Sequence, residues 1–227
     1  MTLKETLAQL EAAGTAQTRK TYARHGVGPK MFGVSYAVLG KLTKQIKRDH
    51  ALALGLWASG WHDARVLATF IADPAQCEVT TLDTWVTEAE SRPLSGAIAK
   101  LAAATPHAEV LADKWRADAR EFAAVAGWDL VAELALNSTL PDAKFAALIK
   151  FIEAHLHSSA NDVRYAMNGA LIAIGCRNAK LEKLATAAAK RIGKVEVDHG
   201  ETGCKTPDAV AYIAKTWAHR AAKAGKK

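Results

Sequence analysis

The sequence has few cysteines and no long apolar run, and each shortage excludes a class of protein. Only three of its 227 residues are cysteines, and Cys77, Cys176 and Cys204 lie far apart. An odd number of scattered cysteines is typical of free thiols in a reducing compartment. No apolar run approaches the roughly 20 residues that cross a bilayer. Lys4 and Glu5 also make the N-terminus unlike a secretory signal. We therefore expect a cytoplasmic protein that does not enter a membrane.

Patterns typical of β-structure and of phosphate-binding loops are scarce as well. Apolar and charged residues alternate only in Lys194 to Val197, which is too short to build a sheet. The glycines of Gly26-Val27-Gly28-Pro29 predict a loop and not a phosphate cradle, because no strand precedes them and no Gly-Lys-Ser/Thr follows.

Catalytic constellations are equally hard to find. No Ser–His–Asp order and no pair of catalytic carboxylates emerges from the sequence. His62-Asp63 and Asp49-His50 are adjacent pairs. Neighbours in sequence point in different directions on a helix, so we expect these four side chains to be solvated.

Helical periodicity, in contrast, runs through almost the whole chain. From Ser35 to Arg48, apolar residues recur at intervals of three to four, which is typical of an amphipathic helix. Its apolar face carries Val38, Leu39, Leu42 and Ile46. Its other face carries Lys41, Lys44, Lys47 and Arg48. Such a helix packs on one side and presents cations on the other.

The same reasoning predicts thirteen helices joined by short linkers. They cover residues 2–14, 16–24, 35–48, 50–59, 62–71, 81–91, 94–104, 107–119, 120–136, 141–156, 160–174, 178–192 and 206–223, the last with Pro207 in its first turn. Short linkers place consecutive helices antiparallel, and stacked helix pairs form a solenoid. The fold class is therefore all-α, an α-solenoid, and residues 1–227 form a single domain because no linker marks a boundary.

The charge balance suggests a partner. The net charge is +7 and the isoelectric point is about 9.3, which favours nucleic acid or another anionic surface. Arg164 and Asn168 lie one turn apart on the helix after residue 160 and suit phosphate or base contacts. The alternative is that Arg164 pairs with a carboxylate and that Asn168 caps or bridges loops.

Two further groups of residues have a structural and a functional interpretation. Asp198, His199, Glu201 and Cys204 are zinc-ligand types, but their order fits no standard spacing. An ordered loop is the simpler reading, and we expect no metal. The six tryptophans, most of them among apolar residues, are expected in the core, with base stacking as the alternative for an exposed one.

The order of several motifs resembles the alkylpurine DNA glycosylases built from HEAT-like repeats, the family of DNA alkylation repair enzymes. The resemblance covers most of the chain. It is carried by Gly33-Val34, Leu56-Trp57, His62-Asp63-Ala64-Arg65, Trp85, Lys114-Trp115 and His157-Ser158-Ser159. It implies an all-α fold of HEAT-like antiparallel helix pairs and a DNA substrate.

The catalytic positions of that family are not matched. The resemblance implies a Ser-Trp-Asp stretch and a further Asp that stabilises the positive charge developing on the sugar as the base leaves. This sequence has Arg92 in place of the Trp and Gly96 in place of the catalytic Asp. The family's Arg falls at Val125 and a further Trp at Ala170. A missing electrostatic partner costs orders of magnitude in rate, so the resemblance predicts no catalytic residues of the usual kind.

Three functions remain open from the sequence. The first is a DNA-binding member of this family without the usual glycosylase chemistry. The second is an active glycosylase that uses other groups, such as Glu88, Glu90 or Glu133, and the third is a protein-binding helical adaptor. We expect a monomer without a cofactor that binds double-stranded DNA, including alkylated DNA. The predicted contacts are Lys41, Lys44, Lys47, Arg48, Arg92, Arg164 and Asn168.

Overall fold

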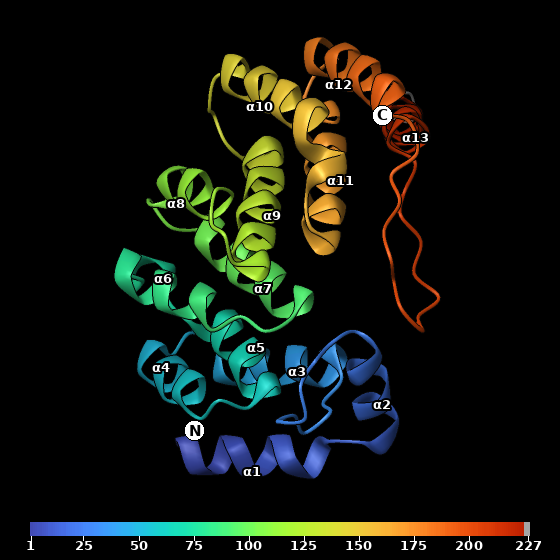
Figure 1. Ribbon diagram of the computed structural model, residues 1–227. Helices are drawn as coiled ribbons and strands as arrows, with labels where there is room; N and C mark the ends of the chain where they lie inside the picture. Colours follow the sequence, from blue (N-terminus) through green and yellow to red (C-terminus); the bar gives the residue numbers. More distant parts are fainter. Residues whose placement is uncertain (225–227) are drawn as a thin grey trace. The chain divides into compact units, whose positions relative to one another are not determined.

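A computed structural model describes residues 1–224 of the chain (Figure 1). All thirteen predicted helices are present, and within this range no residue lies in a β-strand. The α-helices are α1 (Leu3–Ala13), α2 (Ala16–Arg24), α3 (Tyr36–Ile46), α4 (His50–Ala58), α5 (His62–Ile71), α6 (Val79–Thr87), α7 (Arg92–Ala103), α8 (Ala108–Trp115), α9 (Glu121–Asn137), α10 (Asp142–His155), α11 (Asn161–Gly175), α12 (Ala179–Ile192) and α13 (Ala209–Ala224), with short 3-10 turns η1 (Pro74–Gln76) and η2 (Leu156–Ser158). The predicted all-α fold is confirmed.

Side-chain hydrogen bonds to the backbone set several of the helix starts. Thr2 and Glu5 form the reciprocal capping box at α1, and Ser35, Asp49 and Asn178 accept backbone N–H groups at the starts of α3, α4 and α12. Such caps satisfy N–H groups that have no partner within the helix. They explain why these starts could be predicted to within about one residue.

Two helix ends differ from the prediction for identifiable reasons. Helix α3 ends at Ile46 and not at Arg48, because Lys47 adopts a positive φ of 64° that a helix does not allow. Helix α13 begins at Ala209, so Pro207 lies before its first turn. The carboxylate of Asp208 accepts the N–H of Ala211 at 2.7 Å and caps that helix instead.

The chain divides into two compact units. Unit 1 contains residues 1–111 with 200–202, and unit 2 contains residues 112–199 with those from 203 onward. Two compact units can still fold together as one domain. The single domain over residues 1–227 therefore stays a prediction.

Helix α5 is the centre of unit 1. It packs against α1, α3, α4 and α7, and eight of its ten residues are buried. Beside it, the indole rings of Trp57 and Trp85 stack at 4.2 Å and join α4 to α6. Glu88 accepts hydrogen bonds from Trp57 Nε1 at 2.8 Å and from Arg65 at 2.7 Å, and so closes the end of that stack.

The carboxylate of Asp63 is buried and holds the loop before α3. It accepts the backbone N–H groups of Phe32, Gly33 and Val34 at 2.6, 3.2 and 2.6 Å. Gly33 has a φ of 80°, and a Cβ there would lie 2.8 Å from the carbonyl oxygen of Thr15. Only glycine fits that crowded left-handed position.

The expectation that His62 and Asp63 are solvated is therefore wrong. Asp63 has no exposed surface, and the side chain of His62 is only 8% exposed. Helix α5 is surrounded by other helices, so it has no solvated face for a polar pair. Asp49 and His50 are half-buried, and Asp49 accepts the N–H of Leu52 at the start of α4.

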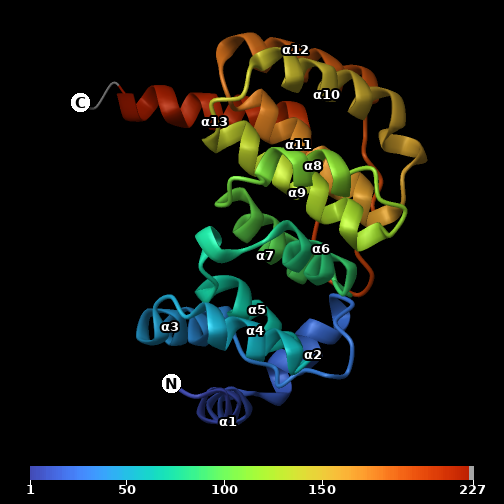
Figure 2. The same cartoon turned by 90° about the vertical axis from the view of Figure 1, so that its left-hand side faces the viewer.

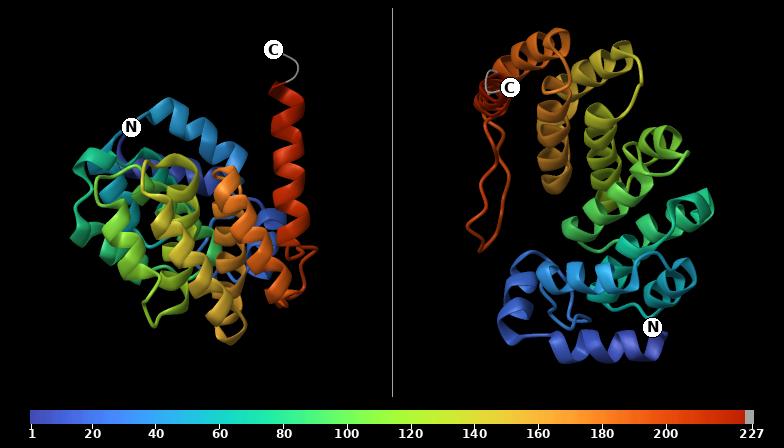
Figure 3. Two further views of the ribbon diagram at one scale, coloured as in Figure 1. Left: turned by 90° about the horizontal axis from the view of Figure 1, so that it is seen from above. Right: turned by 180° about the vertical axis from the view of Figure 1, so that it is seen from behind.

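Unit 2 consists of two helical layers. Helices α9 and α11 pack side by side in one layer, and α13 contacts α11 (Figure 3). Helices α10 and α12 form the other layer (Figure 2). Trp115 and Trp128 fill the core, as expected for most of the tryptophans. Gly127 of α9 lies against the backbone of Arg116, where a Cβ would come within 2.1 Å of the nitrogen.

Arg177 holds the connection between α9 and α10. Its guanidinium donates to the carbonyl oxygens of Ala135, Ser138 and Leu140 at 2.7, 2.9 and 2.8 Å. It also pairs with the carboxylate of Asp142 at 3.3 Å. The carbonyl groups at a helix end have no partner within the helix. Arg177 satisfies one of them at the end of α9 and two more in the segment that follows.

We predict that Asp63→Asn lowers the free energy of unfolding by about 2–3 kcal/mol. The amide offers one acceptor oxygen to a loop that presents three N–H groups, and hydrogen bonds to a charged group contribute about 1.5–3 kcal/mol each. Urea unfolding followed by circular dichroism measures the loss. The control Glu11→Gln, at an exposed position, should change stability by less than about 0.5 kcal/mol. Equal effects of the two substitutions would contradict the role of Asp63.

A second prediction concerns acid stability. Burial lowers the pKa of His62, and Arg65 lowers it further while Asp63 and Glu90 act in the opposite direction. The unfolded chain therefore takes up the proton first as the pH falls below about 6.5. Stability should decrease from that pH down to the lowered pKa of the folded protein. His62→Gln should flatten this dependence, whereas His219→Gln, at an exposed position, should retain it.

Candidate nucleic-acid interface

The cations predicted on the third helix occupy its exposed side and its end. Leu39 and Leu42 are buried, and Lys41 and Lys44 are exposed on the opposite side of α3. Lys47 and Arg48 follow the helix and are also exposed. These four residues are therefore accessible, although only two of them belong to the helix itself.

A groove in unit 1 brings Lys44 and Arg48 together with a third cation, Lys100. It has a volume of about 450 Å³ and lies between α3, α5 and α7. Its lining includes the apolar side chains of Phe70, Ala97, Leu101 and Ala104, and among the lining residues no side chain carries a carboxylate. We call this site the cationic groove, and its three cations are Lys44, Arg48 and Lys100.

One carboxylate lies close to the cationic groove. Asp73 pairs with Arg48 at 3.5 Å, but the Arg48 side chain remains 71% exposed. The pKa of Asp73 lies below its usual value, mainly because Gln76 and the N–H of Ala75 donate to it. An exposed pair of this kind contributes little to stability. A phosphate could therefore replace Asp73 beside Arg48 with little loss of free energy.

Lys100 was not predicted from the sequence. It lies in the last turn of α7, far along the chain from the lysines of α3. Only the packing of α3 and α7 on α5 brings them to one groove. The signal in the sequence was a cation among the apolar residues of the second half of α7, but that pattern alone also fits a solvated side chain.

The other predicted cations lie elsewhere. Arg92 is half-buried at the first residue of α7 and does not line the cationic groove. Arg164 is half-buried on α11 of unit 2, and its Nε is buried without a hydrogen-bond partner among the described residues. Neither belongs to the group around Lys44.

Asn168 lies in the interior and not on the DNA-binding surface predicted for it. Its side chain is 1% exposed, and its Nδ2 donates to the carbonyl oxygen of Pro207 at 3.0 Å. The amide ties α11 to the segment before α13, which is the bridging role that the sequence had left as the alternative. A buried amide committed in this way cannot contact DNA in this conformation.

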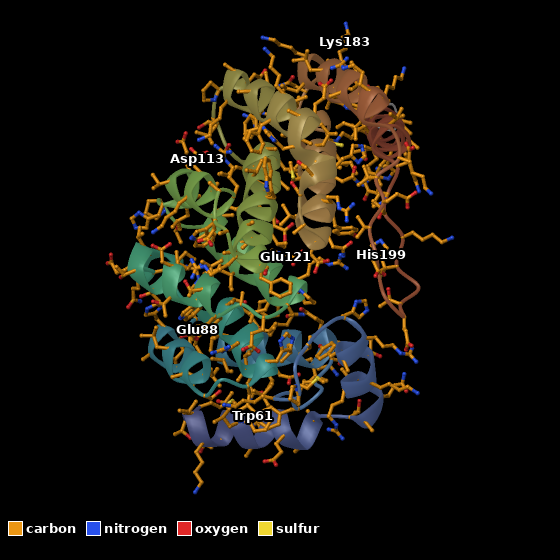
Figure 4. All side chains as sticks on the ribbon, viewed as in Figure 1. Trp61, Glu88, Asp113, Glu121, Lys183 and His199 are labelled. Atoms are coloured by element: carbon orange, nitrogen blue, oxygen red, sulfur yellow. The ribbon has the colours of Figure 1, made fainter. Side chains whose placement is uncertain are left out.

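Three carboxylates could replace the usual catalytic groups. Two of them have hydrogen-bond partners within the protein, and the third lines a small cavity. Glu88, labelled in Figure 4, is engaged with Arg65 and Trp57. Glu133 accepts from Asn137 on the same helix at 3.1 Å. Glu90 is exposed and lines a small cavity with His62 and Ser91. These contacts give no sign of a catalytic arrangement around Glu88 or Glu133.

The polar segment from Asp198 to Cys204 is fixed by neighbouring side chains. The N–H of Asp198 donates to Asn161 Oδ1, and Asn161 Nδ2 donates back to the carbonyl oxygen of Asp198, both at 2.8 Å. His199 is bonded to Thr206 at 3.0 Å and packs edge-on against Tyr165 (His199 is labelled in Figure 4). Within residues 1–224, no three His, Cys, Asp or Glu side chains gather closely enough to hold a metal.

Comparison with known proteins places the chain in a family. A family model described as DNA alkylation repair enzyme matches residues 6–213. The chain belongs to this family. The uncharacterized protein Lin0241 of Listeria innocua is 30% identical to this DNA alkylation repair family member over 213 residues, which are 91% of this chain and 93% of the relative. Lmo0209 of Listeria monocytogenes is 29% identical over 214 residues.

A solved structure matches the whole fold. It is described as a new family of proteins related to the HEAT-like repeat DNA glycosylases with affinity for branched DNA structures. It is 28% identical, has a TM-score of 0.89, and the match covers 97% of this chain and 95% of that one. The fold of this family member is therefore HEAT-like, as predicted. Among residues 1–224, no helix combines the length and the apolar composition needed to cross a bilayer.

The four residues that the resemblance placed at the family's catalytic positions are buried or half-buried. Val125 and Ala170 are fully buried in the core of unit 2. Arg92 and Gly96 are half-buried on α7 of unit 1. A buried valine and a buried alanine present no charge or polar group to a substrate.

Proposed function

We propose that this member of the DNA alkylation repair family binds duplex and branched DNA through its phosphates and lacks the usual base-excision chemistry. The cationic groove is the observation that carries the proposal. Three cations surround an apolar floor there without a carboxylate in the lining. The affinity for branched DNA of the related solved family supports the same kind of partner.

The chemistry of these cations indicates the mode of binding. Lysine and arginine contacts to phosphate position a protein on DNA without reading its sequence. We propose Lys41, Lys44, Lys47, Arg48 and Lys100 as one group of contacts, with Arg92 and Arg164 as further phosphate contacts. We therefore expect little sequence preference, and an affinity that decreases steeply with salt because bound phosphates release counterions.

Location and assembly remain part of the proposal. We propose a cytoplasmic monomer that needs no cofactor. Cys77 and Cys176 are buried free thiols. Burial raises the pKa of the Cys77 thiol to about 11, and Asp73 adds to the effect, so this thiol is a poor nucleophile.

The binding prediction is tested by reversing two charges of the cationic groove. Lys44→Glu with Lys100→Glu should weaken binding to duplex and junction DNA and reduce the slope of log K against log salt by about two, since each phosphate contact adds about one. Fluorescence anisotropy between about 50 and 200 mM salt measures both quantities.

The matched control is Lys4→Glu, an exposed lysine on α1 of the same unit. It should leave the slope nearly unchanged. Binding that is absent at low salt, or that does not respond to salt, would refute the DNA proposal and favour the protein-binding adaptor.

The excision prediction concerns alkylated DNA. Release of methylated purines should be very slow or absent, because the positions of the family's carboxylate and cation hold Gly96 and Val125. Loss of one preorganised electrostatic group typically reduces the rate by about 100- to 1,000-fold. The measurement is base release from alkylated duplex DNA beside an active family member. Turnover equal to that of the control would contradict the proposal and favour Glu90 as the catalytic carboxylate.

A second experiment restores two of the residues that the family has at these positions. Gly96→Asp with Arg92→Trp should recover little activity, because Val125 and Ala170 also differ and catalytic residues act as a unit. A large gain from that pair alone would show that the remaining site is intact.

A further inference from the structure

A small cavity in unit 1 contains two buried polar atoms without a hydrogen-bond partner in the described part of the chain. The cavity has a volume of about 50 Å³ and is lined by residues of three loops and by Arg65 and Leu94. His62 and Ser91 also line it. The Nε2 of His62 and the Oγ of Ser91 are both buried, and among residues 1–224 neither has a hydrogen-bond partner. Buried polar atoms are nearly always satisfied by protein or by water, so two in one cavity indicate a water molecule or a small ligand that both can contact.

The position of Ser91 at a helix start adds an attraction for negative charge. Ser91 is the residue before α7, a helix of 12 residues, and its side chain makes no capping hydrogen bond. Its hydroxyl is therefore free to donate into the cavity. The start of a helix carries a partial positive charge from its unpaired N–H groups.

Three carboxylates and two cations surround the cavity, so the cavity has no excess of positive charge. At its mouth, Lys30 and Glu90 are both exposed and of opposite sign. Deeper in the protein, Arg65 is paired with Glu88 at 2.7 Å. Asp63, next to His62, is committed to three backbone N–H groups. An anion here would therefore depend on neutral donors, which excludes a divalent oxyanion and leaves only a small monovalent ion.

The size of the cavity restricts the ligand further. A water molecule needs at least about 10–15 Å³ of such volume, so a cavity of 50 Å³ admits a few waters or one small ion. We propose that this cavity is a binding site for a chloride-sized inorganic anion, held by hydrogen bonds from Ser91 Oγ and His62 Nε2 at the start of α7. The ion would join α5 to α7 inside unit 1, independently of the DNA surface.

The test compares chloride with gluconate, which is too large for the cavity, at constant sodium concentration and neutral pH. Chloride should raise the Tm of the full chain along a saturating curve, by about 3–6 °C at ten times its Kd. The ring proton signals of His62 in NMR spectra should shift along the same curve, which provides a readout that does not depend on unfolding.

Three variants decide where the anion binds. Ser91→Ala should abolish the response to chloride and leave the Tm in gluconate nearly unchanged, because the hydroxyl it removes has no protein partner. Ser158→Ala, at an exposed position, should respond as the parent does. The double charge reversal of Lys44 and Lys100 should also respond normally, which separates this site from the cationic groove.

Three results would overturn the proposal. Equal Tm values in chloride and gluconate would mean that the cavity holds water only. A full response in Ser91→Ala would place the anion elsewhere. Loss of the response in the charge-reversal variant would assign the anion to the cationic groove.

Discussion

The carboxylate of Asp63 is the contact on which the arrangement of unit 1 depends. A buried charge is tolerated only when hydrogen bonds replace the water it has lost, and Asp63 obtains three of them from one loop. Tyr22 and Arg19 hold the same loop by donating to the carbonyl oxygens of Val34 and Phe32. Because the loop leads directly into α3, the direction of that helix and of its lysines follows from a carboxylate on α5.

Unit 2 uses the same principle with the opposite charge. Arg177 gathers three carbonyl oxygens at the end of α9 and in the loop that follows it. Asp142 balances its charge and also accepts from Asn178 at 3.0 Å. In each unit, an ionised side chain satisfies backbone groups that no helix could satisfy. Loops without regular structure thereby gain a defined conformation.

The sequence predicted helices better than it predicted sites. Apolar spacing and caps such as Thr2 and Ser35 are local, and they define the helices correctly. The burial of Asp63 depends on four helices that surround α5, and the period of α5 alone does not reveal it. Lys100 reaches the cationic groove only through tertiary packing. For the same reason, Arg164 and Asn168 share a helix face as predicted, but the segment before α13 covers Asn168.

The stacked indoles of Trp57 and Trp85 give unit 1 an optical property of its own. Their rings lie 4.2 Å apart and within 2° of parallel, so their electronic transitions couple strongly. The near-ultraviolet signal of the two indoles depends on this contact and changes when the rings separate. In unit 2, the ring of Trp128 lies 5.7 Å from that of Phe151 and is tilted by 30° to it. A near-ultraviolet spectrum recorded during denaturation therefore responds to the separation of the Trp57–Trp85 pair, whereas the far-ultraviolet signal follows the helices of both units.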